Sequence, residues 1–348
     1  MKRAVRLVFR LPAYAALLVL GLEFVCFLVI TVMNLAIYGG VREGSRIVYD
    51  GMTLYTAASG LRATANPEPA PEASRNRRIW FFGGSTTRNG EAPDERTVPS
   101  LVSRLLNEQG PWRVQCVNFG VNSFNSLQEV QQLQKALLER EDRPDCIVFL
   151  DGANDASYFS LYRSVDAHEG YDRIKGFIES YWSSPLGVLK PVMAAVHASF
   201  TRELWQRLTY AFAPLEPDSP LPGELARAMR ARYDYANGVA HCLNAGFVAF
   251  LQPVFWVEPP AGNLPERELA ERAERFPGVR TNFVLVYDAV EPVLAGRPYF
   301  VDLSEAFVGR DFPAYQPDGI HQTDQGREAL ARAMLPGIRR ALEAAGPR

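Results

Sequence analysis

The hydrophobic positions divide the chain into two unequal parts. From Leu11 to Tyr38 apolar residues follow one another almost without interruption, and Glu23 is the sole charged residue in that run. A helix needs about 20 such residues to cross the hydrocarbon core of a bilayer. The pattern therefore predicts a transmembrane anchor over residues 11–38.

The flanks of this run predict its orientation. Residues 1–10 carry four positive charges and no acid, and no small-residue cleavage site follows the apolar run. The run is also too long for the apolar region of a secretory signal, so we expect an uncleaved anchor. Because basic flanks stay in the cytoplasm, residues 1–10 are predicted to form a cytoplasmic tail. The remainder is expected on the far side of a bacterial-type inner (plasma) membrane, as the periplasmic part of a single-pass protein.

Glu23 falls near the middle of the predicted span. One interpretation is a protonated carboxyl that bonds its own helix. The other is a contact with a further transmembrane helix, because intramembrane acids usually face protein. Both stay open, and the second predicts a possible membrane protein partner.

From residue 78 onward, strand-like and helix-like patterns alternate. Continuous apolar runs predict strands within 78–84, 112–120, 145–151, 246–254 and 297–307. Apolar residues at helical spacing predict helices within 97–109, 126–141, 225–244 and 281–294, and from 323 on, where Pro336 should kink or split the helix. Strands that are apolar throughout and separated by helices are typical of a parallel sheet covered on both faces. The predicted fold class is α/β, a doubly wound three-layer sandwich.

Two segments depart from this alternation. Residues 39–77 are mixed in character and rich in proline, alanine and charge toward their end, which predicts a linker. Residues 156–224 are too long for a simple crossover and hold many aromatic residues. Because this insertion follows the carboxyl end of a strand, we expect a helical roof over the site, although it could equally pack on the membrane or a partner.

Composition excludes several classes of function. The 348 residues are 47% hydrophobic and 22% charged, with a net charge of −2. This is ordinary for a folded protein and gives no basic surface for nucleic acid. The four cysteines show no metal-ligand spacing, and there is no P-loop or dinucleotide fingerprint. We therefore expect no cofactor, no metal and no nucleic-acid partner.

Four polar stretches follow predicted strands. They read GGST at 83–86, NFGVNS at 118–123, DGAND at 151–155 and QPDGIHQT at 316–323. Doubly wound sheets place their sites outside the carboxyl ends of the strands, so these stretches are expected to share one crevice.

The side chains in these stretches are chemically complementary. Ser85 offers a nucleophile and His321 a base for neutral pH, while Asp318 can orient and stabilise the imidazole. Backbone N–H groups of Ser85 and Gly120, together with the side-chain amide of Asn154, could form an oxyanion hole. Asp155 is better interpreted as a structural turn residue, and Thr323 as the cap of the last helix.

Together the four stretches resemble the four blocks of the SGNH (GDSL) hydrolase superfamily. Gly152–Asp155 matches G-x-N-D and Asp318–His321 matches D-x-x-H, and the blocks span residues 79–326 in the family's order. Gly84 stands where the family usually has Asp, which is not a triad member. Thr87 stands where a G-x-S-x-G elbow needs Gly, which argues against a common α/β-hydrolase.

The resemblance implies an SGNH-like, flavodoxin-like domain over residues 78–348 with a five-stranded parallel sheet. It also implies serine esterase or O-acyltransferase chemistry, most simply on acetyl esters of an envelope or secreted glycan. Hydrolase and transferase stay open, although the insertion and Glu23 tilt toward a transferase partnered by a polytopic acyl donor. Two alternatives also remain: a non-catalytic glycan-binding or scaffold subunit of an envelope polysaccharide complex, and a lipase acting on membrane lipids.

Overall fold

The computed structural model describes residues 2–38, 47–72, 75–183, 187–209, 213–258 and 278–345. The chain divides into two compact units. One unit combines residues 1–44 with 170–210, and the other combines residues 45–169 with 211–348. We describe each unit by itself.

The larger unit is built on a five-stranded sheet in which every pairing is parallel. The strand order is β4 (Arg113–Asn118), β3 (Asn76–Gly83), β5 (Cys146–Asp151), β6 (Gly246–Leu251) and β7 (Phe300–Asp302). Every residue of β5 and β6 is buried, as expected for strands covered on both faces. The five-stranded parallel sheet predicted from the sequence is therefore confirmed.

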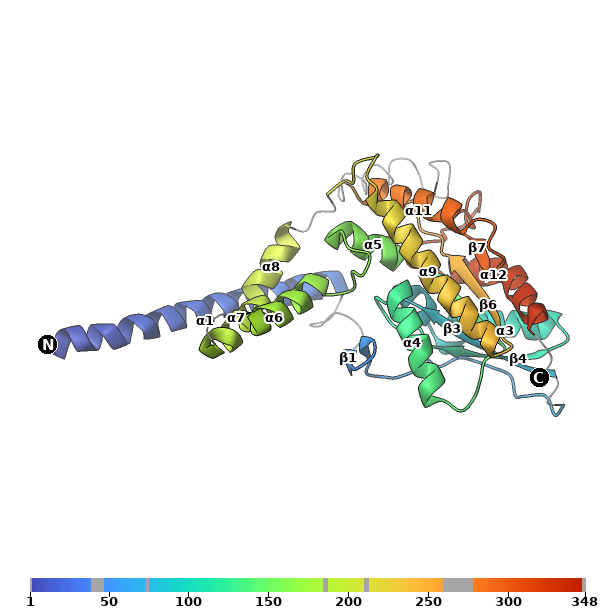
Figure 1. The fold of residues 1–348 in the computed structure, drawn as a ribbon, viewed down its shortest axis with the longest axis horizontal. Helices are drawn as coiled ribbons and strands as arrows, with labels where there is room; N and C mark the ends of the chain where they lie inside the picture. The colour runs from blue at the N-terminus through green and yellow to red at the C-terminus, as the bar shows by residue number, and fades with distance from the viewer. Residues whose placement is uncertain are drawn as a thin grey trace. The chain divides into compact units, whose positions relative to one another are not determined.

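Helices cover both faces of this sheet (Figure 1). Along β3, Ile79 and Phe81 face one apolar core, and Trp80 and Phe82 face the other, because successive strand residues point to opposite faces. The first core is closed by α3 (Val98–Gln109) and α12 (Asp324–Ala344). The second is closed by α4 (Ser126–Glu139), α5 (Ala153–Tyr162), α9 (Leu221–Cys242) and α11 (Val279–Leu294). The three-layer sandwich is confirmed.

The last helix confirms its predicted cap and is not split at Pro336, while a kink there stays a prediction. Thr323 caps α12 as predicted, since its hydroxyl accepts a hydrogen bond from the N–H of Gly326 at 3.1 Å. However, α12 runs through Pro336 without being split. Fully buried Met334 and Ile338 on either side of the proline pack into the core and hold both halves against the sheet.

Part of the predicted linker belongs to the larger unit. Within residues 39–77, β1 (Ile47–Asp50) and β2 (Leu54–Ala57) form an antiparallel hairpin. Further along, the Asn66 side chain donates to the carbonyl of Cys116 and accepts from its N–H, both at 2.8 Å. This segment therefore packs along β4 because its polar groups pair with that edge strand. Residues 39–46 lie outside the described residues.

The smaller unit joins the N-terminal helix to most of the predicted insertion. It contains α1 (Lys2–Tyr38), α6 (Tyr171–Ser183), a 3₁₀ turn (Gly187–Leu189), α7 (Lys190–His197) and α8 (Phe200–Thr209). Within it α8 packs on α1, and α6 packs on α7 (Figure 1). A roof over the site at 156–224 stays a prediction, whereas the grouping of 170–210 with α1 is observed.

Among the described residues, α1 is the one helix long and apolar enough to cross a membrane. Its candidate span runs from Arg10 to Leu35. The two Glu23 carboxylate oxygens accept hydrogen bonds from the start of α8, so this side chain has partners within its own chain. A further membrane protein at Glu23 stays a prediction.

The contact between β6 and α12 gives a test of the packing. A Cβ added at Gly246 would overlap the carbonyl group of Ala341. We expect Gly246→Ala to lower the free energy of unfolding by about 1–3 kcal/mol, because a closely packed helix must shift. Denaturant unfolding of the purified protein measures this.

Gly238→Ala is the matched control, since Gly238 lies within α9 and a Cβ there would meet nothing within 4 Å. It should raise stability by up to about 1 kcal/mol through helix propensity. Equal effects of the two substitutions would contradict the packing described.

Candidate active site

Two glycines allow the chain to present Ser85 at the end of β3. Ser85 is the first residue of the short helix α2 (Ser85–Arg88). A Cβ at Gly83 would overlap the Thr87 side chain, and one at Gly84 would overlap the Asn154 amide and come within 3.0 Å of the Phe124 carbonyl oxygen. Gly84 is therefore in close contact with the Asn154 amide.

Ser85, His321 and Asp318 form a continuous hydrogen-bonded chain. The Nε2 atom of His321 lies 2.7 Å from Oγ of Ser85, and its Nδ1 atom lies 2.6 Å from Oδ2 of Asp318. Because a nucleophile–base contact needs about 2.6–3.2 Å, these distances suit proton transfer from the serine to the imidazole. The structure thus brings together the three residues that the sequence proposes as a triad.

The charge of Asp318 sets the basicity of His321. Burial alone would lower the pKa of His321, but the hydrogen bond to Asp318 and its negative charge outweigh burial and raise that pKa above 6.5. Burial would likewise raise the pKa of Asp318, but its bonds to His321 and to backbone N–H groups hold that pKa below 3.8. The pair therefore favours an ionised aspartate beside a histidine ready to accept a proton.

A tight turn fixes the spacing between Asp318 and His321. The Oδ1 atom of Asp318 accepts from the N–H groups of Ile320 at 2.8 Å and His321 at 2.9 Å. Gly319 between them has a φ of +75°, which favours glycine. Beyond the turn, buried Arg327 donates to the carbonyl of Gln322 at 2.9 Å and so ties this loop to α12.

Asn154 lies in the first turn of α5, directly after β5. Its Nδ2 atom donates to the carbonyl of Phe124 at 2.7 Å, which holds the amide beside Gly84. A primary amide has two N–H donors, so the second hydrogen is not used by this bond. The amide is therefore fixed next to the residue that precedes Ser85.

Gly120 lies in the loop after β4, where its backbone is already engaged. Its N–H donates to Oδ1 of Asn118 at 2.9 Å, and its carbonyl accepts from Arg88 at 3.0 Å. To serve as an oxyanion donor, this N–H has to leave Asn118. In the same loop Ser123 adopts a φ of +69°, a left-handed conformation that is unusual for serine.

The sequence-based interpretation missed two residues that hold this edge together. Arg88 is 4% exposed and donates to the Ser59 hydroxyl as well as to Gly120. Its position one helical turn after Ser85 is the feature of the sequence that could have identified it. Gln252, directly after β6, is buried and accepts from the Thr86 hydroxyl at 2.9 Å.

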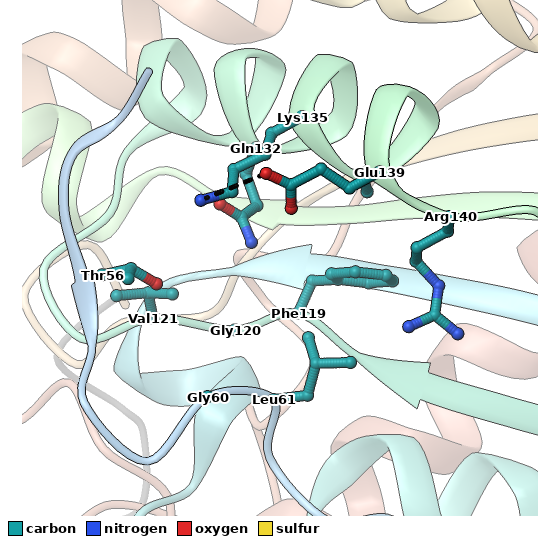
Figure 2. A pocket seen from close by; sticks show the side chains of 11 residues that line it. Thr56, Gly60, Leu61, Phe119, Gly120, Val121, Gln132, Lys135, Glu139 and Arg140 are labelled. Carbon is teal, nitrogen blue, oxygen red and sulfur yellow. Dashed lines mark ion pairs between the residues drawn. The ribbon is translucent and has the colours of Figure 1, made fainter. Parts of the chain in front are cut away.

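A cavity of about 220 Å³ reaches Gly120 from the side of the 56–61 segment (Figure 2). Helix α4 contributes Gln132, Lys135 and Glu139 to one wall, where Lys135 and Glu139, one turn apart, form an ion pair at 3.7 Å. The triad side chains do not line it. The cavity therefore lies apart from the Ser85–His321 contact.

Buried carboxyl groups underlie the loop and helix that carry Asn154. Glu129 of α4 is 1% exposed, and Asp151 at the end of β5 is 3% exposed. Burial, reinforced by mutual repulsion, raises the pKa of Glu129 well above its usual range. Burial likewise raises the pKa of Asp151, to about 7. Their neighbour Asp155, in the first turn of α5, pairs with Arg232 at 3.6 Å and accepts from the Ser126 hydroxyl at 2.5 Å, and a structural role for it stays a prediction.

No protein-family model matches the chain, and no curated protein matches it either. Solved structures of similar fold include LAE5, an alpha/beta hydrolase enzyme from the metagenome of Lake Arreo, Spain. It is 15% identical with a TM-score of 0.43, and the match covers 76% of this chain and 96% of that one. The acetyl xylan esterase AlAXEase shows 13% identity and a TM-score of 0.41, with 75% and 99% covered. A member of the lipolytic protein G-D-S-L family from Veillonella parvula shows 13% identity and a TM-score of 0.37, with 74% and 96% covered.

The Glu129–Asp151 pair predicts a specific pH dependence of stability. Between about pH 4 and 7 the unfolded chain releases protons that the folded pair retains, so this pair lowers stability as pH rises, by about 1.4 kcal/mol per pH unit for each such proton. We expect Glu129→Gln to flatten that fall, measured by denaturant unfolding across this range.

Glu139→Gln is the control, since Glu139 lies on the same helix with its side chain 62% exposed. It should leave the pH dependence as in the wild type. A Glu129→Gln protein with an unchanged slope would contradict the shared burial of the two carboxyls.

Proposed function

We propose that this chain is a serine esterase or O-acyltransferase that works through an acyl-enzyme at Ser85. The observation that carries the proposal is the chain of hydrogen bonds from Ser85 through His321 to Asp318, at 2.7 and 2.6 Å. A serine hydroxyl is a weak nucleophile unless a base accepts its proton, and His321 lies where such a base is needed.

The proposed mechanism has two halves. Ser85 Oγ attacks the ester carbonyl while its proton passes to Nε2 of His321, and Asp318 stabilises the imidazolium that results. The developing oxyanion is stabilised by the N–H of Ser85 and the amide of Asn154, with Gly120 as the predicted third donor. Collapse of the intermediate breaks the ester bond, and His321 returns the proton to the leaving alcohol. Water or an acceptor hydroxyl then repeats the sequence on the acyl-enzyme.

For location and substrate we propose an anchored enzyme of the cell envelope. The basic residues in the first turns of α1 and the apolar span Arg10–Leu35 support a single-pass anchor with the sheet-bearing unit outside the cytoplasm. A glycan bearing acetyl esters is the substrate that this location and the SGNH-like sequence blocks favour. Both halves of the mechanism serve a hydrolase and a transferase equally, because the acyl-enzyme is common to them.

Active-site labelling tests the nucleophile. We expect the detergent-solubilised protein to react with a fluorophosphonate, and Ser85→Ala to abolish that labelling because Oγ is the attacking atom. His321→Ala should reduce it by roughly 10³-fold or more, since the serine then lacks its base. Labelling is read by gel fluorescence and by the mass of the modified peptide.

The exposed histidine of α9 provides the control, because His241→Ala removes an imidazole that lies outside the triad. It should label like the wild type. A folded wild-type protein that stays unlabelled would instead favour the non-catalytic binding or scaffold subunit. Turnover of a small acetyl ester with and without an oligosaccharide acceptor then separates hydrolase from transferase.

The His321–Asp318 pair predicts the pH profile of the reaction. His321 acts as a base only when neutral, and its pKa is raised above 6.5, so kcat/KM should rise with pH through a value higher than 6.5. In Asp318→Asn the bond and charge that raise this pKa are lost while burial still lowers it. The profile should shift to lower pH, and kcat should fall by roughly 10³–10⁴-fold. A profile that stays in place would show that Asp318 does not act on His321.

A further inference from the structure

In the smaller unit, helix α8 follows the C-terminal half of α1. The carboxylate of Glu23 accepts from the N–H of Phe200 at 2.7 Å and from the hydroxyl of Thr201 at 2.5 Å. At the other end of α8, Arg207 donates to Oδ1 of Asn34 at 2.8 Å. These contacts place the start of α8 beside Glu23 and bring the Arg207 side chain, near the end of α8, to Asn34 on the C-terminal side of Glu23.

The depth of this contact follows from helix geometry. Glu23 lies at the middle of the candidate span Arg10–Leu35. The rise from Glu23 to Asn34 is about 16 Å, and ten residues of α8 cover about 15 Å. If α1 crosses a bilayer, α8 therefore occupies the leaflet on the C-terminal side of α1, from the middle of the membrane outward.

The polar groups at this contact satisfy one another. The first N–H groups of a helix have no carbonyl partner within it, and a carboxylate within hydrocarbon needs a donor. Glu23 meets both needs, and the positive end of the α8 dipole favours its charge. Nearby, Glu203 pairs with Arg207 at 2.8 Å and with Arg173 of α6 at 3.5 Å, so these charges are paired within the unit.

The outer surface of the same helices exposes many large apolar side chains, beside charged residues of α6 such as Asp172, Lys175 and Glu179. Trp182 of α6, Val188 of the 3₁₀ turn, Val192 of α7, and Trp205 and Leu208 of α8 are each 60–83% exposed. Helix α1 of the same unit also exposes apolar side chains, such as Val32 at 64%. Apolar area of this extent needs a cover, and the bilayer already covers α1.

We propose that helices α6, α7 and α8 form a membrane-embedded element that enters the leaflet on the C-terminal side of α1. The hydrocarbon and head-group region of that bilayer is the partner of their exposed apolar surface, and Glu23 is the residue that anchors α8 at depth. The element adds a second lipid contact beside the single spanning helix. Trp182 and Trp205 then lie against lipid, where tryptophan is favoured near the interface.

Tryptophan quenching in vesicles tests this proposal. The full chain is reconstituted into phosphatidylethanolamine–phosphatidylglycerol vesicles with plain or brominated acyl chains. Two of the five tryptophans lie on this surface, so brominated lipid should remove up to about two-fifths of the emission. Trp182→Phe combined with Trp205→Phe should abolish that loss. Trp112→Phe, in the larger unit, should leave it unchanged.

Other occupants of the surface give different results. Quenching of Trp182 and Trp205 by aqueous iodide but not by brominated lipid would place the surface in water and overturn the proposal. Protection from both quenchers would mean that protein, such as a second copy of the chain, covers it, and would overturn the proposal equally.

The anchoring role of Glu23 has its own test. In a Trp182→Phe background, Glu23→Leu should lower the quenching of Trp205 by lipid because the start of α8 loses its acceptor. Glu23→Gln keeps an acceptor oxygen and should retain the quenching. Equal quenching in all three proteins would show that Glu23 does not hold α8.

Discussion

The contact between Ser85 and His321 depends on bringing together residues that are 236 positions apart in the chain. A parallel sheet does this because all of its strands end at the same edge. Ser85 follows β3 in the middle of the sheet, and His321 lies in the loop that leads from β7 to α12. The buried strands β5 and β6 lie between them, so the packing of both apolar cores fixes the distance on which proton transfer depends.

Small residues after β3 are the second requirement for placing Ser85 at this edge of the sheet. Gly83 and Gly84 let the backbone turn sharply out of β3, and the space above Gly84 is filled by the amide of Asn154. The glycine at 84 and the asparagine at 154 therefore form one steric arrangement. In this conformation a Cβ at 84 would lie 2.3 Å from Nδ2 of Asn154, so a larger residue there would require the amide to shift.

The predictable features were those encoded by local pattern or by chemistry at strand ends. The runs around Trp80 and Phe149 identified buried strands, and Thr323 identified a helix start. Long-range polar pairing was not predictable, because neither Asn66 bonding Cys116 nor Arg88 bonding Gly120 leaves a mark in hydrophobic periodicity. The interpretation of Gly120 as an oxyanion donor left out a local bond: its N–H donates to Oδ1 of Asn118, the last residue of β4, and periodicity does not show such side-chain to backbone bonds.

The insertion shows how a single polar position can organise a membrane-facing unit. Glu23 alone is costly within an apolar helix, and the first turn of α8 alone is costly away from water. Together the two remove each other's unsatisfied groups through the N–H of Phe200 and the hydroxyl of Thr201. A hydrogen bond is electrostatically stronger where water is excluded. The pairing of Glu23 with α8 is therefore suited to an apolar surrounding, which also suits the exposed apolar side chains of α8. The internal pairing of the polar groups of α8 and its outward apolar side chains are thus both consistent with contact to lipid.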